Sequence, residues 1–600
     1  NYSSSKGGGV YTSEDSDIYF RKNVVSDNIS SSGGGIFLNY PTNDFIFENN
    51  LIENNKAEYG GGIYQNSSPM TYSGSTIRNN YADEMGGGMY FYNIPTVTFD
   101  SSNKNNIYNN VARVEGLDFA SSVASHITID VIVDTFSVIA SAPYFAYPYN
   151  DYTFNIEHGK IEQAEADLFV STAGSDENDG LTETTPLKTL TFALKRIKAE
   201  ARTPRTIYLE NGTYSTSETG EVFPINTRNN VSIVGEDRRL TIIDGEDMHQ
   251  LFICYKDSNF IFQSMTMQNG YAVNGGAIYL YGSNPQINDL IIRHNNSDNA
   301  GAGIFAYQNS DISLHQVFIH ENSTTYNGGG LFASYYSDID FNLCTISHNL
   351  AAHGGGVYLA SHGDIVIDST EINYNSALNG GGYLGEGGAL FISDCSILLK
   401  RSSLENNEAG YAGGAVYVTN CDELRLENMF ISENSSQSRG GAFYCTSDIF
   451  ELYNSHVLQN SADRGAGFYF NGSEEPQIIN TVIADNYTYG YDGGGFYLRY
   501  SDIHLINCTV CENSSLDDGG GFFCYNSDPI VINSIFDENE PQSIFLEDSA
   551  PNVTYSNIEG GAEQSWFGTG CIDQDPLFAN PDYYYDFRLT DPSPCIDTGI

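Results

Sequence analysis

Residues 354–376 read GGGVYLASHGDIVIDSTEINYNS, and the chain repeats this pattern at intervals of about 26 residues. The stretch contains three short runs in which apolar and polar residues alternate, separated by glycine, serine and asparagine. Alternation with a period of two is typical of β-strands, because successive side chains point to opposite faces. Three strands per repeat predict one coil of a parallel β-helix, with neighbouring coils stacked about 4.8 Å apart.

A recurring asparagine marks the end of the third run. Successive copies in the second half of the chain are 26 or 27 residues apart, except for one step of 32. We expect a structural ladder at one bend, because asparagine satisfies backbone groups and tolerates unusual dihedral angles. The predicted ladder contains Asn295, Asn322, Asn349, Asn375, Asn407, Asn434, Asn460, Asn486 and Asn513; the series also includes Asn269, Asn539 and, in an earlier array, Asn28, Asn55, Asn80 and Asn110.

The repeats predict an all-β chain of two tandem solenoids. Residues 1–165 are expected to form the C-terminal part of a first β-helix with irregular last coils, and 205–560 the coils of a second. Residues 166–204 are expected to cap the second β-helix, and 561–600 to close it. The sequence TPLKTLTFALKRIKAEA at 185–201 predicts one short capping helix, with Thr185 as its N-cap and Pro186 in its first turn.

The net charge of −50 limits the partners of the chain. Nucleic acid is excluded as a partner, because phosphate binding needs a basic surface. No run of 18 apolar residues is present, so we expect no direct membrane insertion by this segment. The chain opens inside a repeat, which predicts that it is part of a longer protein.

Three motifs resemble those of right-handed parallel β-helix proteins secreted by bacteria. GGAI at 275–278 and FDEN at 536–539 are similar to the repeats of the chlamydial polymorphic outer-membrane proteins. VSTAGSDENDGLTETTPLKTLTFAL at 170–194 resembles the N-terminal cap of pectate-lyase-like β-helices, and the residues from DPLF at 575 to 599 resemble a closing motif of such surface proteins. The resemblance implies a right-handed coil and an extracellular or bacterial cell-surface location. It is specific for the fold and does not specify an activity, because this fold carries both enzymes and adhesins.

A column of aromatic residues follows the glycines, one in each coil. These residues alternate with inward positions such as Ile278 and Leu280, so we expect them to point outward as a glycan-binding or adhesive stripe. The alternative is that stacked rings only stabilise neighbouring coils. This aromatic column contains Tyr279, Phe305, Phe332, Tyr358, Phe391, Tyr417, Tyr444, Tyr469, Tyr497 and Phe523.

Calcium is the one cofactor for which the sequence offers ligands. The loop SDENDG at 175–180 supplies Asp176, Asn178 and Asp179, but lacks the bidentate glutamate of an EF-hand. The alternative for this loop is an ordinary cap turn. A column of aspartates before the second strand is a second set of calcium ligands, or simply a row of turn residues: Asp17, Asp44, Asp311, Asp338, Asp364, Asp448 and Asp502.

The ten cysteines lie between 254 and 595 and are interpreted mainly as small buried apolar residues. Two pairs are disulfide candidates, because their spacings of 26 and 24 residues are close to one repeat: Cys395 with Cys421, and Cys571 with Cys595.

Two functions follow from these patterns. The first is a non-catalytic, structural or adhesive β-helix that presents a face to a polysaccharide or another cell-surface ligand. The second is a polysaccharide lyase or glycoside hydrolase, for which a histidine-rich stretch gives the candidate region: His294, His315, His320, His348, His353 and His362. The regular repeat favours the first function, and no catalytic residue is assigned.

Overall fold

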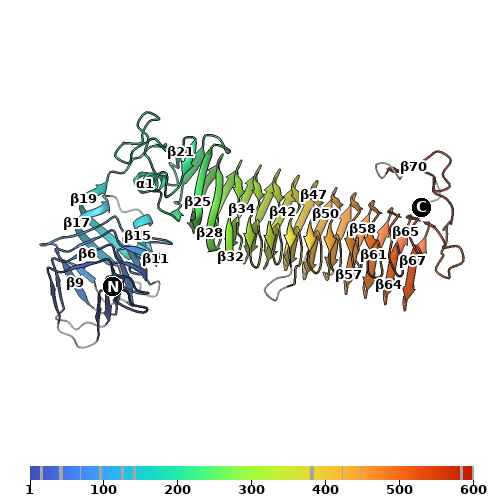
Figure 1. Ribbon diagram of the computed structural model, residues 1–600, viewed down its shortest axis with the longest axis horizontal. Helices are drawn as coiled ribbons and strands as arrows, with labels where there is room; N and C mark the ends of the chain where they lie inside the picture. Colours follow the sequence, from blue (N-terminus) through green and yellow to red (C-terminus); the bar gives the residue numbers. More distant parts are fainter. Residues whose placement is uncertain are drawn as a thin grey trace. The chain divides into compact units, whose positions relative to one another are not determined.

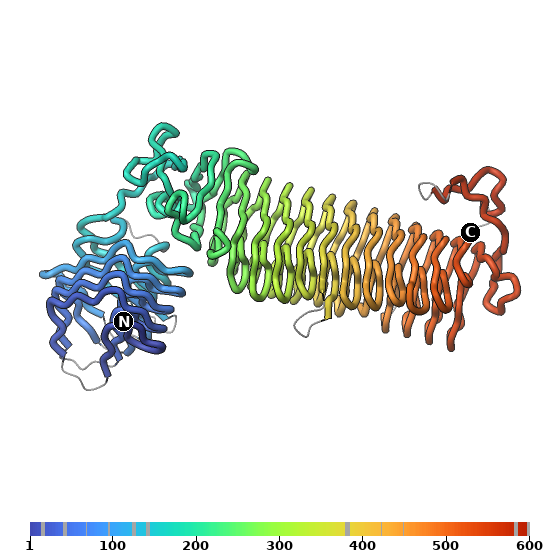
Figure 2. The backbone as a smooth tube through the Cα atoms, in the orientation of Figure 1, coloured from blue at the N-terminus to red at the C-terminus, as the bar shows by residue number. Residues whose placement is uncertain are grey.

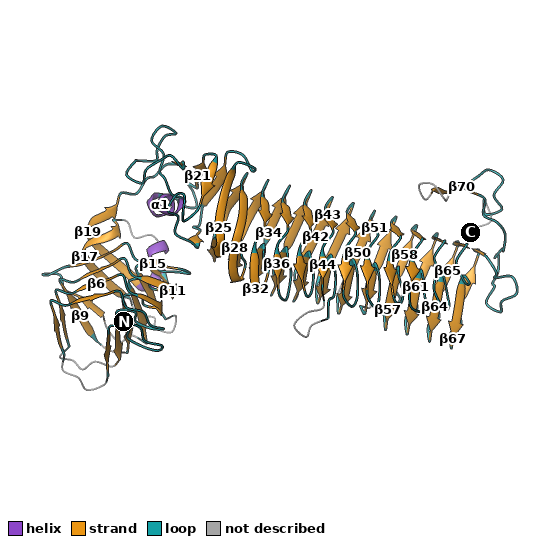
Figure 3. Ribbon diagram, in the orientation of Figure 1, coloured by secondary structure: helices purple, strands orange, loops and turns teal. Residues whose placement is uncertain are grey.

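The structure is a computed structural model. It describes all residues except 14–17, 40–44, 68, 94–96, 123–127, 140–142, 379–383, 422, 448, 474, 581–585 and 597–600. The chain divides into two compact units, Asn1–Tyr208 with Pro224–Val231 and Leu209–Phe223 with Ser232–Ile600. Strands dominate both units, and α1 (Leu190–Arg196) is the one α-helix in the described part of the chain (Figure 3).

One coil of the second unit shows how the repeat folds. Strands β41 (Val357–Ala360), β42 (Asp364–Asp368) and β43 (Glu371–Asn373) follow the three runs of the sequence, and the two-residue β44 (Ser376–Ala377) completes the coil. Each strand pairs in parallel with the same strand of the next coil, so that Tyr358 faces Phe391 and Ile372 faces Leu404. The coils therefore stack in register (Figures 1 and 2).

Three parallel sheets run along this unit. One extends from β27 (Ser258–Gln263) to β68 (Asn552–Thr554), and another from β25 (Thr241–His249) to β69 (Asn557–Ile558). The third, here called the aromatic sheet, contains β26 (Phe252–Tyr255), β29 (Ile278–Tyr281), β33 (Ile304–Tyr307), β37 (Leu331–Ser334), β41, β45 (Leu390–Ser393), β49 (Val416–Thr419), β53 (Phe443–Cys445), β57 (Phe468–Asn471), β61 (Phe496–Arg499), β64 (Phe522–Tyr525) and β67 (Ile544–Glu547).

The first unit has the same parallel stacking but longer final strands. One sheet contains β1 (Val10–Thr12), β4 (Ile36–Asn39), β8 (Ile63–Asn66), β12 (Met89–Tyr92), β16 (Phe119–Ser121) and β18 (Ala146–Tyr147). Another contains β3 (Val24–Ser26), β6 (Leu51–Glu53), β10 (Thr76–Arg78), β14 (Asn105–Tyr108), β17 (Ile129–Val138) and β19 (Tyr152–Ile161). The ten-residue strands β17 and β19 pair over most of their length.

The small residues before each aromatic position are required by the turn. Gly354 has a φ of 61°, a left-handed conformation that glycine adopts without strain. A Cβ on Gly355 would lie 2.4 Å from the backbone oxygen of Ser376, and one on Gly356 would lie 2.7 Å from that of Ala389. The first position is therefore set by its dihedral angle, and the next two by the close approach of neighbouring backbone.

A file of buried asparagines lies along the opposite bend. The amide nitrogen of Asn349 donates to Asn375 Oδ1 at 3.0 Å and to the backbone oxygen of Ile319 at 2.9 Å, and the Asn349 N–H donates to the same Oδ1. The same pair of bonds joins Asn322 to Asn349 and recurs from Asn295 to Asn539. Each buried amide thus joins two successive coils.

Asn269, the first asparagine of the series predicted from the spacing, does not belong to this file, so the prediction is wrong at that residue. It has a φ of 54° and occupies the left-handed position that His294 takes one coil later. Gly270 takes the ladder position, and its N–H donates to Asn295 Oδ1 at 2.8 Å. The spacing between repeats itself varies between 26 and 27 residues, so it cannot show that Asn269 is one residue away from the ladder position.

Helix α1 is shorter than the sequence predicts and begins later. Its N-cap is Thr189, whose hydroxyl accepts the N–H of Phe192 at 3.1 Å. Thr185 does not cap it, because the chain before Thr189 is extended and Leu187 pairs with Val170. The apolar spacing of the segment resembles a longer helix, but its first residues are used in strand-like hydrogen bonds.

Asp118 ends the asparagine file of the first unit. It stands at the position that Gly88 occupies one coil earlier, and its Oδ1 accepts the side-chain amide of Asn110 at 2.9 Å. The Asp118 carboxyl thus takes the place of the next asparagine. Burial raises its pKa to about 7, against the opposing hydrogen bonds from Ser137 and Asn110.

No helix in the described residues is long and apolar enough to cross a membrane.

Replacing Asn349 with alanine should destabilise the second unit by about 2–4 kcal/mol, because Asn322 then loses its buried acceptor. Urea unfolding of the full chain measures this change. The matched control is Asn296→Ala, an exposed asparagine on the neighbouring face, which should change the unfolding free energy by less than about 1 kcal/mol. Equal effects of the two changes would contradict a stabilising role for the file.

Asp118→Asn should stabilise the first unit increasingly as the pH rises. The folded pKa of Asp118 lies above the unfolded value of about 3.9, so its protonated form stabilises the fold below that pH. This contribution is lost as the pH rises through about 7. Asparagine stays neutral, so the gain over the wild type should reach roughly 2–4 kcal/mol at pH 8. Calorimetry at pH 4, 6 and 8 tests this, and a pH-independent difference would contradict it.

Candidate functional site

The aromatic column is a continuous stack of rings. Consecutive members lie 4.7–5.3 Å apart between ring centroids, with interplanar angles of 3–16°. The rings point away from the lumen, as the alternation predicts. Because they stack along the axis of the coil, however, each ring covers the faces of its neighbours. Only ring edges remain for a ligand.

Neighbouring side chains cover much of this column, which corrects the expected exposed stripe. Phe305, Phe332, Tyr444, Tyr469 and Phe523 are buried, and Tyr469 is only 2% exposed. The cover comes from residues just before the glycines: the Arg439 guanidinium lies 5.5 Å from the centroid of Tyr469, and His353 contacts Phe391 edge-on. The geometry of the column is that of a structural ladder.

A second group of aromatic residues lies at the C-terminal ends of the first strands of the aromatic sheet and in the turn after β37, and its members are half-buried or exposed. It is here called the tyrosine corner and contains Tyr255, Tyr281, Tyr307, Tyr335 and Tyr336. Tyr255 and Tyr281 stack 4.9 Å apart, and Tyr307 follows at 6.1 Å. Tyr335 lies 4.6 Å from Tyr307 but is tilted by 52°, so the stack is broken there.

The break in the stack exposes ring faces. Tyr335 and Tyr336 are 48% and 58% exposed, and both have a left-handed φ, of 59° and 60°. Such a conformation is rare for a bulky residue. It occurs here because the turn from the aromatic sheet to the next uses two left-handed residues, as at Ser361 and His362. The exposed imidazole of His362 stacks on Tyr336 at 5.5 Å.

Aspartates border the tyrosine corner. Asp311, Asp338 and Asp364 follow the turn on three successive coils and are exposed. Asp338 Oδ1 accepts the N–H of Asp364 at 2.8 Å, and Asp311 Oδ1 lies 3.4 Å from the N–H of Asp338. Partial desolvation of the carboxyl, together with the charge of Asp338, raises the pKa of Asp311 against the hydrogen bond from the Asp338 N–H. Asp502 repeats this arrangement with the N–H of Asp528, whereas Asp17, Asp44 and Asp448 lie outside the described residues.

The three residues of the predicted calcium loop bind protein groups. Asp176 accepts the N–H groups of Lys188 and Thr189 at 2.9 and 3.0 Å, and thereby anchors the start of α1. Asp179 Oδ1 accepts the hydroxyl of Thr185 at 2.6 Å, and the Asn178 amide donates to the backbone oxygen of Pro186. These bonds give the loop the geometry of a cap turn.

The disulfide predictions are wrong for both pairs. Cys395, Cys421, Cys571 and Cys595 are all free thiols, the first two buried and the others half-buried. Cys395 and Cys421 stand at equivalent positions of stacked coils but fill buried apolar space, whereas Cys571 and Cys595 lie in the closing segment, where the spacing of the repeat does not apply. Burial raises the pKa of Cys421 to about 12, which leaves the thiol protonated and unreactive.

The histidines of the candidate catalytic region are spread over several faces. His294 Nε2 and His320 Nδ1 contact Glu321 at 3.3 and 2.9 Å, whereas His348 stacks on Tyr374. His315 bonds to Asn342, and His353 to Glu386 at 3.2 Å. His294 and His320 therefore share Glu321, whereas His315, His348 and His353 each contact a different residue.

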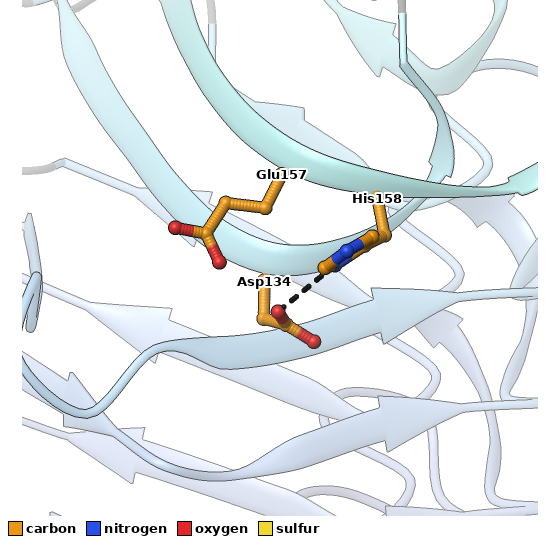
Figure 4. Close-up of side chains that lie close together, drawn as sticks. All are labelled: Asp134, Glu157 and His158. Carbon is orange, nitrogen blue, oxygen red and sulfur yellow. Dashed lines mark hydrogen bonds and ion pairs between the residues drawn. The ribbon is translucent and has the colours of Figure 1, made fainter.

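Sequence reasoning missed a histidine–carboxylate group in the first unit. Asp134 on β17 and Glu157 and His158 on β19 have ligand atoms that all lie within 4.8 Å of one another. Figure 4 shows His158 and Asp134 joined by a contact of 3.1 Å, with the Glu157 carboxylate beside them. Adjacent residues of a regular strand face opposite sides, so the sequence predicts that Glu157 and His158 lie apart. They lie on one side here because the strands are locally irregular.

A cavity lies near the last coils of the second unit. Its volume is about 890 Å³, and its lining includes Glu538, Glu540, Glu559 and Trp566. A smaller cavity of about 210 Å³ shares Glu538 and adds Glu512, Asp537 and Asp575. Burial, followed by the charges of the neighbouring carboxylates, raises the pKa of Asp537 to about 7.

Two families match the sequence. Residues 1–138 and 414–571 match "Right handed beta helix region", and residues 172–363 match "Protein of unknown function (DUF1565)". No curated protein matches the chain significantly.

Several solved structures are similar at low identity. Pectate lyase Pel9A is 12% identical with a TM-score of 0.23, and the match covers 74% of this chain and 93% of that one. The mannuronan C-5 epimerase AlgE6 A-module of Azotobacter vinelandii is 11% identical with a TM-score of 0.27, covering 60% and 92%. Pectin methylesterase PemA of Erwinia chrysanthemi is 12% identical with a TM-score of 0.22, covering 47% and 81%.

These identities and TM-scores are too low to carry an argument. The description of the chain therefore rests on its parallel coils and on the family matches. The chain contains two right-handed β-helix regions and, between them, a DUF1565 region.

Proposed function

We propose that the chain is a non-catalytic, extracellular β-helix scaffold that binds a neutral polysaccharide at the tyrosine corner. The observation that carries this proposal is the pair of half-exposed rings, Tyr335 and Tyr336, beside a row of carboxylates. Sugar rings present C–H faces that pack on aromatic faces, and hydroxyl groups that donate to carboxylates. The corner supplies both kinds of group, whereas the buried aromatic column supplies only ring edges.

The repeat suits an extended ligand. Tyr307, Tyr335 and Tyr336 come from neighbouring coils, and Asp311, Asp338 and Asp364 run parallel to them. A glycan chain lying along the coil axis would therefore meet tyrosine and carboxylate on two successive coils and His362 with Asp364 on the third, about 4.8 Å apart. Rigid strands hold the corner, so little conformational entropy is lost on binding.

The charge of the chain selects among polysaccharides. A net charge of −50 repels polyanions such as polyuronates, so the ligand is a neutral glycan. A cell-surface or extracellular location agrees with this ligand class and with the secreted proteins that the motifs resemble.

The double change Tyr335→Ser with Tyr336→Ser should strongly weaken retention on neutral glycans. Binding of the full chain to an array of neutral and uronate polysaccharides measures the effect, and the wild type should prefer the neutral set. The loss of two stacking faces should weaken binding by about tenfold or more.

The matched control is Tyr500→Ser. Tyr500 is 52% exposed and takes the same left-handed position at the corner after β61, but away from the cluster. This variant should bind like the wild type. Retention that survives the double change would remove the corner as the binding site, and a preference for uronates would contradict the charge argument.

A glycoside hydrolase is the second candidate, favoured by the acidic cavity. Hydrolysis needs one protonated carboxyl to donate to the leaving oxygen and one carboxylate to activate water or attack the sugar. Asp537 is the candidate acid, and the surrounding carboxylates include candidate bases. The larger cavity has the volume of a small-ligand site, and Trp566 offers an aromatic wall.

This second function predicts release of reducing ends from a neutral glycan, falling as the pH rises above about 7, where Asp537 loses its proton. Asp537→Asn should remove the activity, and the Tyr335 and Tyr336 variants should leave the catalytic step intact. Product release by Asp537→Asn equal to that of the wild type, or no product from the wild type, would eliminate the hydrolase.

A further inference from the structure

The group Asp134, Glu157 and His158 is a candidate metal centre distinct from the proposed glycan surface. Among the described residues it is the one set of three or more histidine, cysteine, aspartate or glutamate side chains whose ligand atoms converge this closely. We propose that these three residues bind a divalent first-row transition-metal ion such as Zn²⁺. The imidazole distinguishes the site from a simple acidic patch, because nitrogen ligands suit zinc and its neighbours better than calcium.

Irregular strand geometry brings the three side chains to one face. Between β14 and β17 the register shifts so that Asp134 is an extra residue, with Val133 facing Asn105 and Thr135 facing Asn106. Such a bulge turns two consecutive side chains outward. Strand β19 follows β17 in register, with Ile156 facing Val133 and His158 facing Thr135, so Glu157 lies opposite Asp134. Both Glu157 and His158 are exposed as a result.

The distances suit a small ion. Zinc binds nitrogen and oxygen ligands at about 2.0–2.2 Å, so ligand atoms of a tetrahedral site lie roughly 3.3–3.5 Å apart. His158 Nδ1 and Asp134 Oδ1 are 3.1 Å apart, close to that edge. The three ligand atoms are within 4.8 Å of one another, so a side-chain rotation of Glu157 completes the set. Three protein ligands leave a fourth position for water.

Two neighbours set the state of the carboxylates. The hydroxyl of Thr135 donates to Asp134 Oδ2 at 3.0 Å, which orients the carboxylate with its other oxygen toward His158. Lys104 forms an ion pair with Glu157 Oε1, so the Lys104 ammonium group neutralises this carboxylate in the absence of a metal ion. A bound metal ion would displace this ammonium group, since both cannot be close to the same carboxylate without repulsion.

The long strands make the site rigid. Ten-residue strands β17 and β19 carry all three ligands, and their pairing over most of their length holds the backbone around the bulge better than a loop would. The strongly negative chain also raises the local concentration of divalent cations.

Isothermal titration of the chelator-treated full chain with ZnCl₂ tests the proposal. The wild type should show one saturable site that His158→Ala removes or weakens by at least about tenfold. Lys104→Gln removes the competing ammonium group at similar length and should tighten zinc binding by about threefold or more. The matched control is His320→Ala, which breaks a histidine–carboxylate contact in the second unit, at Glu321, and should leave the site unchanged.

Circular dichroism verifies that each variant folds. If His158→Ala does not fold, the zinc titration is made with Glu157→Gln instead. Zinc binding by His158→Ala or Glu157→Gln equal to that of the wild type would overturn the proposal, as would the absence of a saturable site in the wild type. A wild-type preference for Ca²⁺ over Zn²⁺ would contradict ligation by the imidazole.

Discussion

The hydrogen bond from one buried asparagine to the next is the interaction on which the structure depends. Each amide donates both to the asparagine of the following coil and to the backbone of the preceding one, as Asn349 does to Asn375 and Ile319. A coil that slipped by one residue would lose both bonds and turn its apolar side chains outward. The register of the coils, and thus every column on the surface, follows from this constraint.

Stacking in register decides what each column can do. Where aromatic side chains face each other directly, as Tyr358 and Phe391 do, the rings cover each other's faces. Little aromatic surface then remains for a ligand. Where a tyrosine lies outside the stacked column, as Tyr335 and Tyr336 do after Ser334, ring surface becomes available. The same holds for the histidine–carboxylate group, which exists because Asp134 is an extra residue in its strand. Candidate function is therefore concentrated at irregularities in an otherwise regular chain.

The sequence was sufficient to predict the parallel coils, the inward positions and the outward direction of the aromatic column, because these depend on periods of two and 26. It left open whether this column binds a ligand or only stacks between neighbouring coils, since ring orientation is not encoded in the period of the repeat. The Thr189 cap was missed because an extended segment carries helix-like apolar spacing. The predicted disulfides are absent because a spacing of about one repeat does not by itself make two cysteines bond. Glu157 and His158 were missed because adjacent residues share a face only at a bulge.

In-register stacking is tested most directly by disulfide trapping across one coil. Leu350 and Ser376 face each other on neighbouring strands, whereas Ser323 lies two coils from Ser376. Cysteines at facing positions of adjacent strands lie within bonding distance, and those two coils apart do not. Under mild oxidation, the variant Leu350→Cys with Ser376→Cys should form an intramolecular crosslink, and Ser323→Cys with Ser376→Cys should remain reduced. Equal crosslinking of the two variants, or none in the first, would contradict the register from which every site described above is built.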